Sequence, residues 1–118
     1  MPIIETTIDV EQSVVELEAK LVDIPSIIGS RTISICQISE QPQQLRLSLE
    51  CDQSLVEVDA YYAEQMLYNG WQQITSIKDD HEIMQVYKKP LKICIITLRQ
   101  IASKALISLF ISDVQIEI

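Results

Sequence analysis

Apolar residues recur at helical spacing between residues 54 and 71, and both ends of this stretch carry helix-ending signals. Ser54 and Glu57 have the spacing of a capping box, in which a hydroxyl and a carboxylate bind free N–H groups of the first turn. At the other end Asn69-Gly70 favours the left-handed residue that ends a helix, with Trp71 packing back on Met66. The pattern therefore predicts one capped helix over residues 54–71.

The predicted helix has three kinds of face. One stripe is expected to pack on a sheet, and it holds Leu55, Val58, Tyr62 and Met66. An adjacent stripe holds Val56, Ala60, Ala63 and Leu67. The small alanines of this second stripe allow close approach of the N-terminal segment or of another copy of the chain. The outward face holds Glu57, Tyr61, Glu64 and Tyr68.

Alternating apolar and polar positions on both sides of the helix predict strands. Before the helix the predicted strands cover residues 31–38 and 45–51, and after it they cover 71–77, 82–88, 91–99 and 105–118. Two strands, one helix and a strand meander predict an α+β fold. We expect one central helix packed on an antiparallel sheet of five to six strands, a helix-grip-like arrangement.

The last two predicted strands raise specific expectations. Residues 91–99 are almost continuously apolar, which predicts a central strand covered on both faces or nearly so. In the terminal strand the apolar positions change from odd to even after Ile111, which predicts a bulge or bend at Ser112-Asp113. If this strand lies at the sheet edge it can pair with another chain, and if it is central it belongs to the core.

Residues 1–29 admit two interpretations. Asp9 can cap a short helix from Val10 to Leu21, or the segment is an extended arm leading to Pro25. Gly29-Ser30 then predicts a turn. We expect residues 1–118 to form a single domain, with residues 1–29 as the arm or short helix and residues 30–118 as the helix-on-sheet core.

Charge narrows the classes of partner. The 118 residues carry a net charge of −8, with 9 basic and 17 acidic side chains, so nucleic acid and anionic lipid are not expected as partners. The acidity is interpreted as a source of solubility or as a docking face for a basic partner. No transmembrane segment is predicted, because Lys92, Arg99 and Lys104 interrupt the most apolar run. As written the chain is predicted to be cytoplasmic, or located in the cell envelope or periplasm if a leader was removed.

The sequence offers little for catalysis. His81, the one histidine, lies among acidic residues 79–82, where a solvated turn is favoured over a metal site because adjacent side chains diverge. Cys36 would lie opposite Cys51 if the intervening turn centred on Gln43-Gln44, so a disulfide between them stays open. No Gly-rich phosphate loop and no nucleophile with a base are apparent. No catalytic residue, metal site or cofactor is therefore predicted, and the chain is not expected to be an enzyme.

A binding surface is predicted on the outward face of the helix. Tyr61 and Tyr68 lie two turns apart there, flanked by Glu57 and Glu64. Exposed tyrosines with this spacing can anchor a protein partner, and they can equally lie over a loop.

With these elements placed, residues 22–111 resemble a type of small bacterial envelope domain, mostly lipoproteins without an assigned function. The motifs that carry the resemblance are Asp23-Ile24-Pro25, Tyr61-Tyr62, Met66, Gly70-Trp71, Lys88 and Lys92-Ile93-Cys94. That pattern also includes a leader and a lipid-bearing cysteine near the start, which residues 1–118 do not show, so an envelope location is expected only if a leader was removed. The resemblance implies a helix-over-sheet fold and a non-enzymatic role, with no catalytic residue to transfer.

The leading hypothesis is therefore a non-catalytic protein-interaction or structural module in an envelope or secretion-associated assembly. The alternative is a small acidic cytosolic chaperone or adaptor that binds an extended segment of a partner on its sheet edge. A homodimer is an expected form of the second class.

Overall fold

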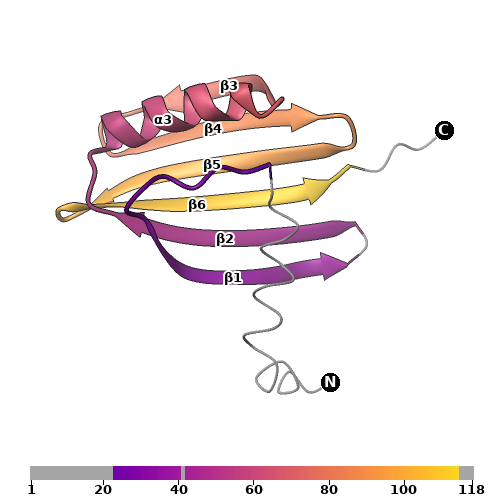
Figure 1. Ribbon diagram of the computed structural model, residues 1–118, viewed down its shortest axis with the longest axis horizontal. Helices are drawn as coiled ribbons and strands as arrows, with labels where there is room; N and C mark the ends of the chain where they lie inside the picture. The colour runs from indigo at the N-terminus through magenta and orange to yellow at the C-terminus, as the bar shows by residue number, and fades with distance from the viewer. Residues whose placement is uncertain (1–22, 41, 115–118) are drawn as a thin grey trace, which may run out of the picture.

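A computed structural model describes residues 23–40 and 42–114, which form one helix and six strands (Figure 1). The elements, in chain order, are β1 (Arg31–Glu40), β2 (Gln43–Cys51), α3 (Leu55–Tyr68), β3 (Gln72–Lys78), β4 (Glu82–Lys89), β5 (Lys92–Ile101) and β6 (Lys104–Asp113). The predicted α+β fold, with one helix on an antiparallel sheet, is confirmed.

The six strands form one antiparallel sheet in the order β1-β2-β6-β5-β4-β3. Helix α3 lies across the β3–β5 half of one face, and the segment 23–30 lies on the same face beside it (Figure 1). Because side chains alternate between the two faces of a strand, every second residue of β2, β4, β5 and β6 enters the core beneath these two elements.

Both ends of α3 follow from local sequence. The Ser54 side chain accepts a hydrogen bond from the Glu57 backbone N–H, and the Glu57 carboxylate accepts one from the Ser54 N–H, which completes the capping box. At the C-terminal end Gly70 has φ +90°, and the Trp71 N–H donates to the Met66 carbonyl at 3.0 Å. All four residues of the predicted packing stripe are buried: Leu55, Val58, Tyr62 and Met66.

Both outer strands of the sheet contain β-bulges. In β1 the pairing register shifts at Ile33 and again at Ile38, and in β3 it shifts at Ile74. All three bulged isoleucines are exposed, at about half of their possible surface. A bulge interrupts the ladder of backbone groups that an incoming strand would use, so neither edge offers a long continuous pairing site.

The structure decides one open question about the strands and corrects two expectations. The terminal strand β6 is central, between β2 and β5, so the core interpretation holds for it. Its pairing with β5 runs through Ser112 and Asp113 without a register shift, so the predicted bulge is absent there. Strand β5 is central as expected, but its residues facing away from α3 are partly exposed rather than covered.

The N-terminal predictions have mixed outcomes. The predicted helix from Val10 to Leu21 and residues 115–118 lie outside the described residues. The turn at Gly29-Ser30 is confirmed, since Gly29 has φ +87° and the Ser30 N–H donates to the Ile27 carbonyl at 3.1 Å. Within the described ranges, no helix is long and apolar enough to cross a membrane.

Candidate functional site

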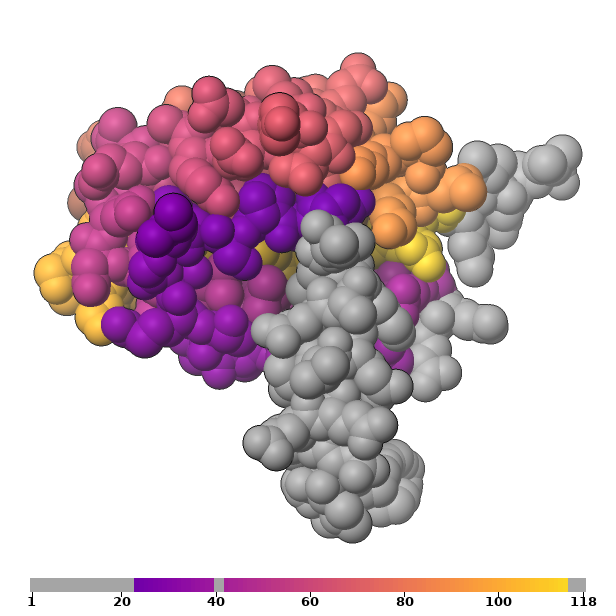
Figure 2. Space-filling view, in the orientation of Figure 1, coloured from indigo at the N-terminus to yellow at the C-terminus, as the bar shows by residue number. Residues whose placement is uncertain are grey.

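The predicted helix-face surface is partly used by the fold itself. The Tyr61 hydroxyl donates to the Ser26 carbonyl at 2.9 Å, and its ring packs edge-on against Tyr62 with 5.2 Å between ring centroids. Tyr61 therefore lies over the 23–30 segment, and this partial burial raises the pKa of its phenol. Figure 2 shows that segment, in indigo, lying against the helix.

The other three predicted binding residues have different environments. Tyr68 is 85% exposed, and Glu64 is exposed at the rim of a shallow groove of about 430 Å³ between α3 and the 23–30 segment. The Glu57 carboxylate lines the same groove but accepts hydrogen bonds from Ser54, so capping occupies it. The structure thus brings Glu57, Tyr61 and Glu64 to one groove, and Tyr68 is not among the residues that line it.

The His81 region is an exposed turn between β3 and β4. One oxygen of Asp79 accepts hydrogen bonds from the backbone N–H groups of His81 and Glu82, both at 2.8 Å, and these bonds lower the pKa of its carboxyl group. Glu82 pairs with Arg99 at 2.8 Å. No cluster of three or more metal-ligating side chains occurs in residues 23–40 and 42–114.

The three cysteines are all free, and the structure contradicts the Cys36–Cys51 pairing. The pairing of Glu40 with Gln43 and the bulge at Ile38 place Cys36 opposite Arg46 instead. Cys36 is exposed on the face away from α3, whereas Cys51 and Cys94 are buried in the core beneath the helix.

Thiol reactivity in the native protein should separate these cysteines. Burial raises the pKa of the Cys94 thiol from its ordinary value near 9 to about 12, so Cys94 stays protonated and unreactive both at pH 8 and at pH 10. We expect Ellman's reagent to modify one thiol per chain quickly, at Cys36, and all three after unfolding. Cys36→Ser should abolish the fast reaction, and a fast phase that persists in this variant would contradict the assignment.

A polar network beneath α3 was not predicted from the sequence. Gln85 is fully buried on β4; its amide donates to the backbone carbonyl and carboxylate of Asp59, and its side-chain oxygen accepts from the Tyr87 hydroxyl. Asp59 also forms an ion pair with Lys78 of β3 at 2.8 Å. These bonds connect the middle of α3 to two strands, so the network positions the helix on the sheet.

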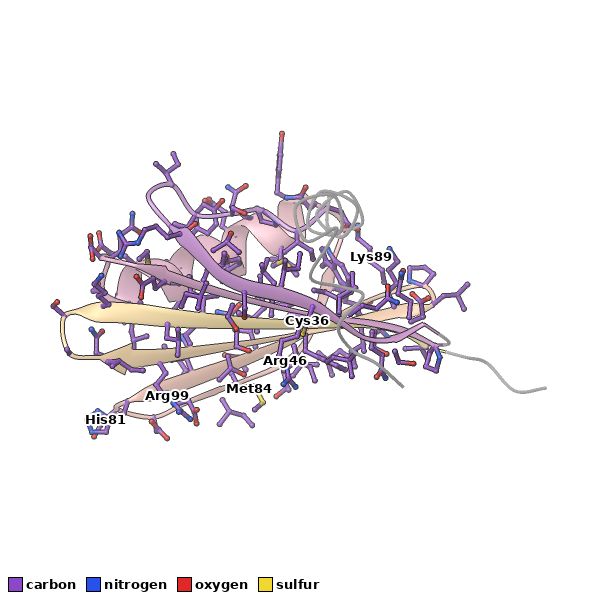
Figure 3. The ribbon with its side chains drawn as sticks, turned by 90° about the horizontal axis from the view of Figure 1, so that it is seen from below. Cys36, Arg46, His81, Met84, Lys89 and Arg99 are labelled. Carbon is purple, nitrogen blue, oxygen red and sulfur yellow. The ribbon has the colours of Figure 1, made fainter. Side chains whose placement is uncertain are left out.

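The sheet face opposite α3, here called the open face, carries the second unpredicted feature. Strand alternation directs eight large apolar side chains of β3–β6 to this face. Ile101 lies at the end of β5, and the other seven together define the apolar field. They are Ile77, Met84, Val86, Ile93, Ile95, Leu106 and Phe110. Figure 3 shows Met84, Arg46 and Arg99 on the side of the sheet away from the helix, whereas Lys89 lies on the helix side.

The centre of the apolar field is continuous because its members are neighbours along or across strands, whereas Leu106 lies apart, paired with Arg99 and Glu50. Val86 pairs with Ile95, and Ile95 pairs with Phe110, so these three side chains form one row across β4, β5 and β6. Ile77 and Met84 form an adjacent pair. All seven are partly or fully exposed, whereas the buried residues of the same strands face α3. An exposed apolar surface of this extent is typical of a binding site for another macromolecule.

Comparison with known proteins supplies no assignment. No protein-family model, curated protein or solved structure matches the chain. The resemblance to envelope domains therefore stays a prediction, and the function has to be argued from the surfaces described above.

Proposed function

We propose that this protein is a non-catalytic protein-interaction module that binds its partner on the open face of the sheet. The observation that carries the proposal is the apolar field, a continuous row of side chains such as Val86, Ile95 and Phe110 that remains partly exposed in the folded chain. Apolar side chains in the centre of a surface supply most of the binding energy of protein interfaces. A role in an envelope or secretion-associated assembly, suggested by the sequence, belongs to this proposal.

The alternative proposal is a chaperone or adaptor that binds an extended segment along the sheet edge. The bulges at Ile33, Ile38 and Ile74 weaken the support for edge pairing, because they divide both outer strands. Binding on the face needs no free backbone groups, so it is compatible with bulged edges. The geometry therefore favours the open face over the sheet edge as the binding surface. The exposed end of the helix with Tyr68 serves as a second surface against which the open face is tested.

Partner capture with matched variants tests the proposal. Val86→Thr combined with Phe110→Thr removes apolar surface from the open face while retaining a residue with high strand propensity at Val86. The immobilised wild-type chain should retain partner proteins from an extract of its source cells. The amount of partner retained by the double variant should be at least about tenfold lower, because each large apolar contact contributes about 1 kcal/mol or more.

The control variant is Ile33→Thr with Ile38→Thr, which removes a similar apolar surface from the β1 edge. This control and Tyr68→Ala should both capture partners as the wild type does. Equal capture by the open-face variant and the wild type would refute the open face as the binding surface. Loss of capture in the β1 control alone would favour the edge-binding adaptor, and loss in Tyr68→Ala alone would favour the helix face.

A further inference from the structure

The open face is basic, although the chain as a whole is acidic. Five of the nine basic side chains of the chain lie on this face: Arg31, Arg46, Lys88, Arg99 and Lys104. Glu50 and Glu82 bring carboxylates to it, and Asp52 carries a third carboxylate near Arg31 at its edge. With a chain net charge of −8, this concentration of cations on one side is opposite to the overall composition.

Three of these five cations are already paired. Arg31 and Lys104 both contact the Glu50 carboxylate, at 2.6 Å and 3.4 Å, and Arg99 contacts Glu82 at 2.8 Å. The hydrogen bond from Arg31 and the nearby Lys104 lower the pKa of Glu50, so this carboxylate is ionised at neutral pH.

Arg46 and Lys88 are the remaining two cations, and neither has a carboxylate partner within the described part of the chain. Both side chains are exposed. The Arg46 guanidinium lies 6.0 Å from the centroid of the Phe110 ring, at the β2 side of the apolar field. Lys88 lies two residues after Val86 on β4, on the same face, and pairs with Ile93 of β5 at the other side of the field. The two available cations thus flank the apolar row.

The separation of the two cations indicates the form of a fitting partner. Arg46 on β2 and Lys88 on β4 are separated by three strand-to-strand spacings across the sheet and by two residues along the strands. At ordinary sheet spacings this corresponds to about 16 Å between their backbones. Three turns of α-helix, about 11 residues, cover a similar distance and return to the same side of the helix. An amphipathic helix with carboxylates about three turns apart can meet both cations while its apolar side covers the row between them.

We propose that the open face binds an acidic amphipathic helix of a partner protein, with two carboxylates meeting Arg46 and Lys88 and apolar side chains covering Val86, Ile95 and Phe110. This inference rests on the proposed function and specifies the chemistry of the partner. A second copy placed face to face is disfavoured, because both faces carry the same excess of positive charge. An anionic membrane is disfavoured by the net charge of −8.

A synthetic peptide pair tests the charge assignment. The probe is an 18-residue amphipathic helix with a leucine face and glutamates three turns apart, and the matched peptide has lysine at every glutamate position. Fluorescence anisotropy should show binding of the acidic peptide that weakens between 0.05 M and 0.5 M salt, because exposed ion pairs are screened. The basic peptide should bind at least about tenfold more weakly.

Two variants with equal charge change locate the contact. Arg46→Gln with Lys88→Gln should weaken binding of the acidic peptide by about tenfold. Lys78→Gln with Lys92→Gln removes two cations from the helix side of the sheet and should leave the affinity within about twofold of wild type. Circular dichroism checks that both variants keep their fold.

Equal binding of the acidic and basic peptides, or equal weakening by both double variants, would overturn the inference. So would the absence of acidic-peptide binding at millimolar concentration. Co-sedimentation with phosphatidylglycerol vesicles in place of peptide binding would also overturn it. A dimer in light scattering that Val86→Thr with Phe110→Thr dissociates would assign the face to a second copy and would overturn it too. If open-face variants abolish cellular capture but the acidic peptide fails, only the charge of the partner is refuted and the interaction module stands.

Discussion

Replacing Trp71 by alanine is expected to lower the free energy of unfolding by about 4 kcal/mol. The indole is only 2% exposed, and its N–H donates to the Asp23 carbonyl at 3.1 Å. The Lys89 ammonium lies 5.0 Å from the indole centroid and 2.7 Å from the Asp23 carboxylate. One side chain therefore connects the end of α3, the start of the 23–30 segment and β4, and its removal leaves a large cavity where all three meet.

The effect is measured by urea denaturation followed by far-ultraviolet circular dichroism, because Trp71 is the only tryptophan and its fluorescence is lost in the variant. Hydrogen exchange of the 23–30 segment should accelerate, since the Asp23 carbonyl loses its donor. Tyr68→Ala on the exposed end of the same helix is the control and should change stability by less than about 0.5 kcal/mol. A cost below about 1 kcal/mol for the Trp71 variant would show that the indole does not connect these elements.

Replacing Gln85 by leucine is expected to cost about 3 kcal/mol, although leucine is close to glutamine in volume. The substitution removes the amide donor of the Asp59 carboxylate and the short-distance acceptor of the Tyr87 hydroxyl, which keeps only a long contact to the Tyr62 carbonyl at 3.5 Å. The Tyr87 side chain is fully buried beneath α3, and the Asp59 side chain is only 15% exposed, so water replaces the lost partners poorly. The loss therefore measures the hydrogen bonds and not the packing.

A double-mutant cycle with Tyr87→Phe separates the contributions in the Gln85 network. The phenylalanine removes the hydroxyl that loses its short-distance acceptor in Gln85→Leu, so the double variant should be more stable than the sum of the two single losses predicts, by about 1 kcal/mol or more. Urea denaturation of the four proteins gives the coupling energy. Strictly additive losses would show that Gln85 and Tyr87 do not act as one network.

The parts of the fold encoded by neighbouring residues could be predicted from the sequence. The helix was found with both of its ends, because the capping box at Ser54 and the glycine stop at Gly70 act within one turn of chain. The positions of the strands followed from the apolar pattern in the same way. The turn at Gly29-Ser30 was found because a positive φ at glycine needs no distant partner.

Features that depend on distant residues could not be predicted in this way. The bulge at Ile38 shifts the register of β1, and no residue type distinguishes it from an ordinary strand position. Glu40 pairs with Gln43, so the connection is not centred on Gln43-Gln44 and the conditional alignment of Cys36 with Cys51 does not hold. The placement of β6 between β2 and β5 depends on the pairing of strands far apart in the sequence.

The apolar field was missed for a related reason. In β4 the outward residues Met84 and Val86 are as apolar as the inward residues Ile83 and Tyr87, and the polar residue Gln85 points inward. Apolar residues on both sides of a strand are normally taken as evidence of burial on both faces. In this sheet one face is buried and the other is partly exposed. Which face is which depends on the side that α3 covers. The signal available in the sequence was an excess of apolar residues in β4 and β5 beyond what one helix can cover.

The three bulged isoleucines also affect how the chain behaves when it is concentrated. Fibril growth requires successive copies to stack in register along an uninterrupted outer strand, with every N–H and carbonyl matched to the next chain. In β1 the longest stretch between the shifts at Ile33 and Ile38 is residues 34–37, which is too short to hold a stacked copy. We therefore expect this domain to polymerise through its edges less readily than a sheet with regular outer strands.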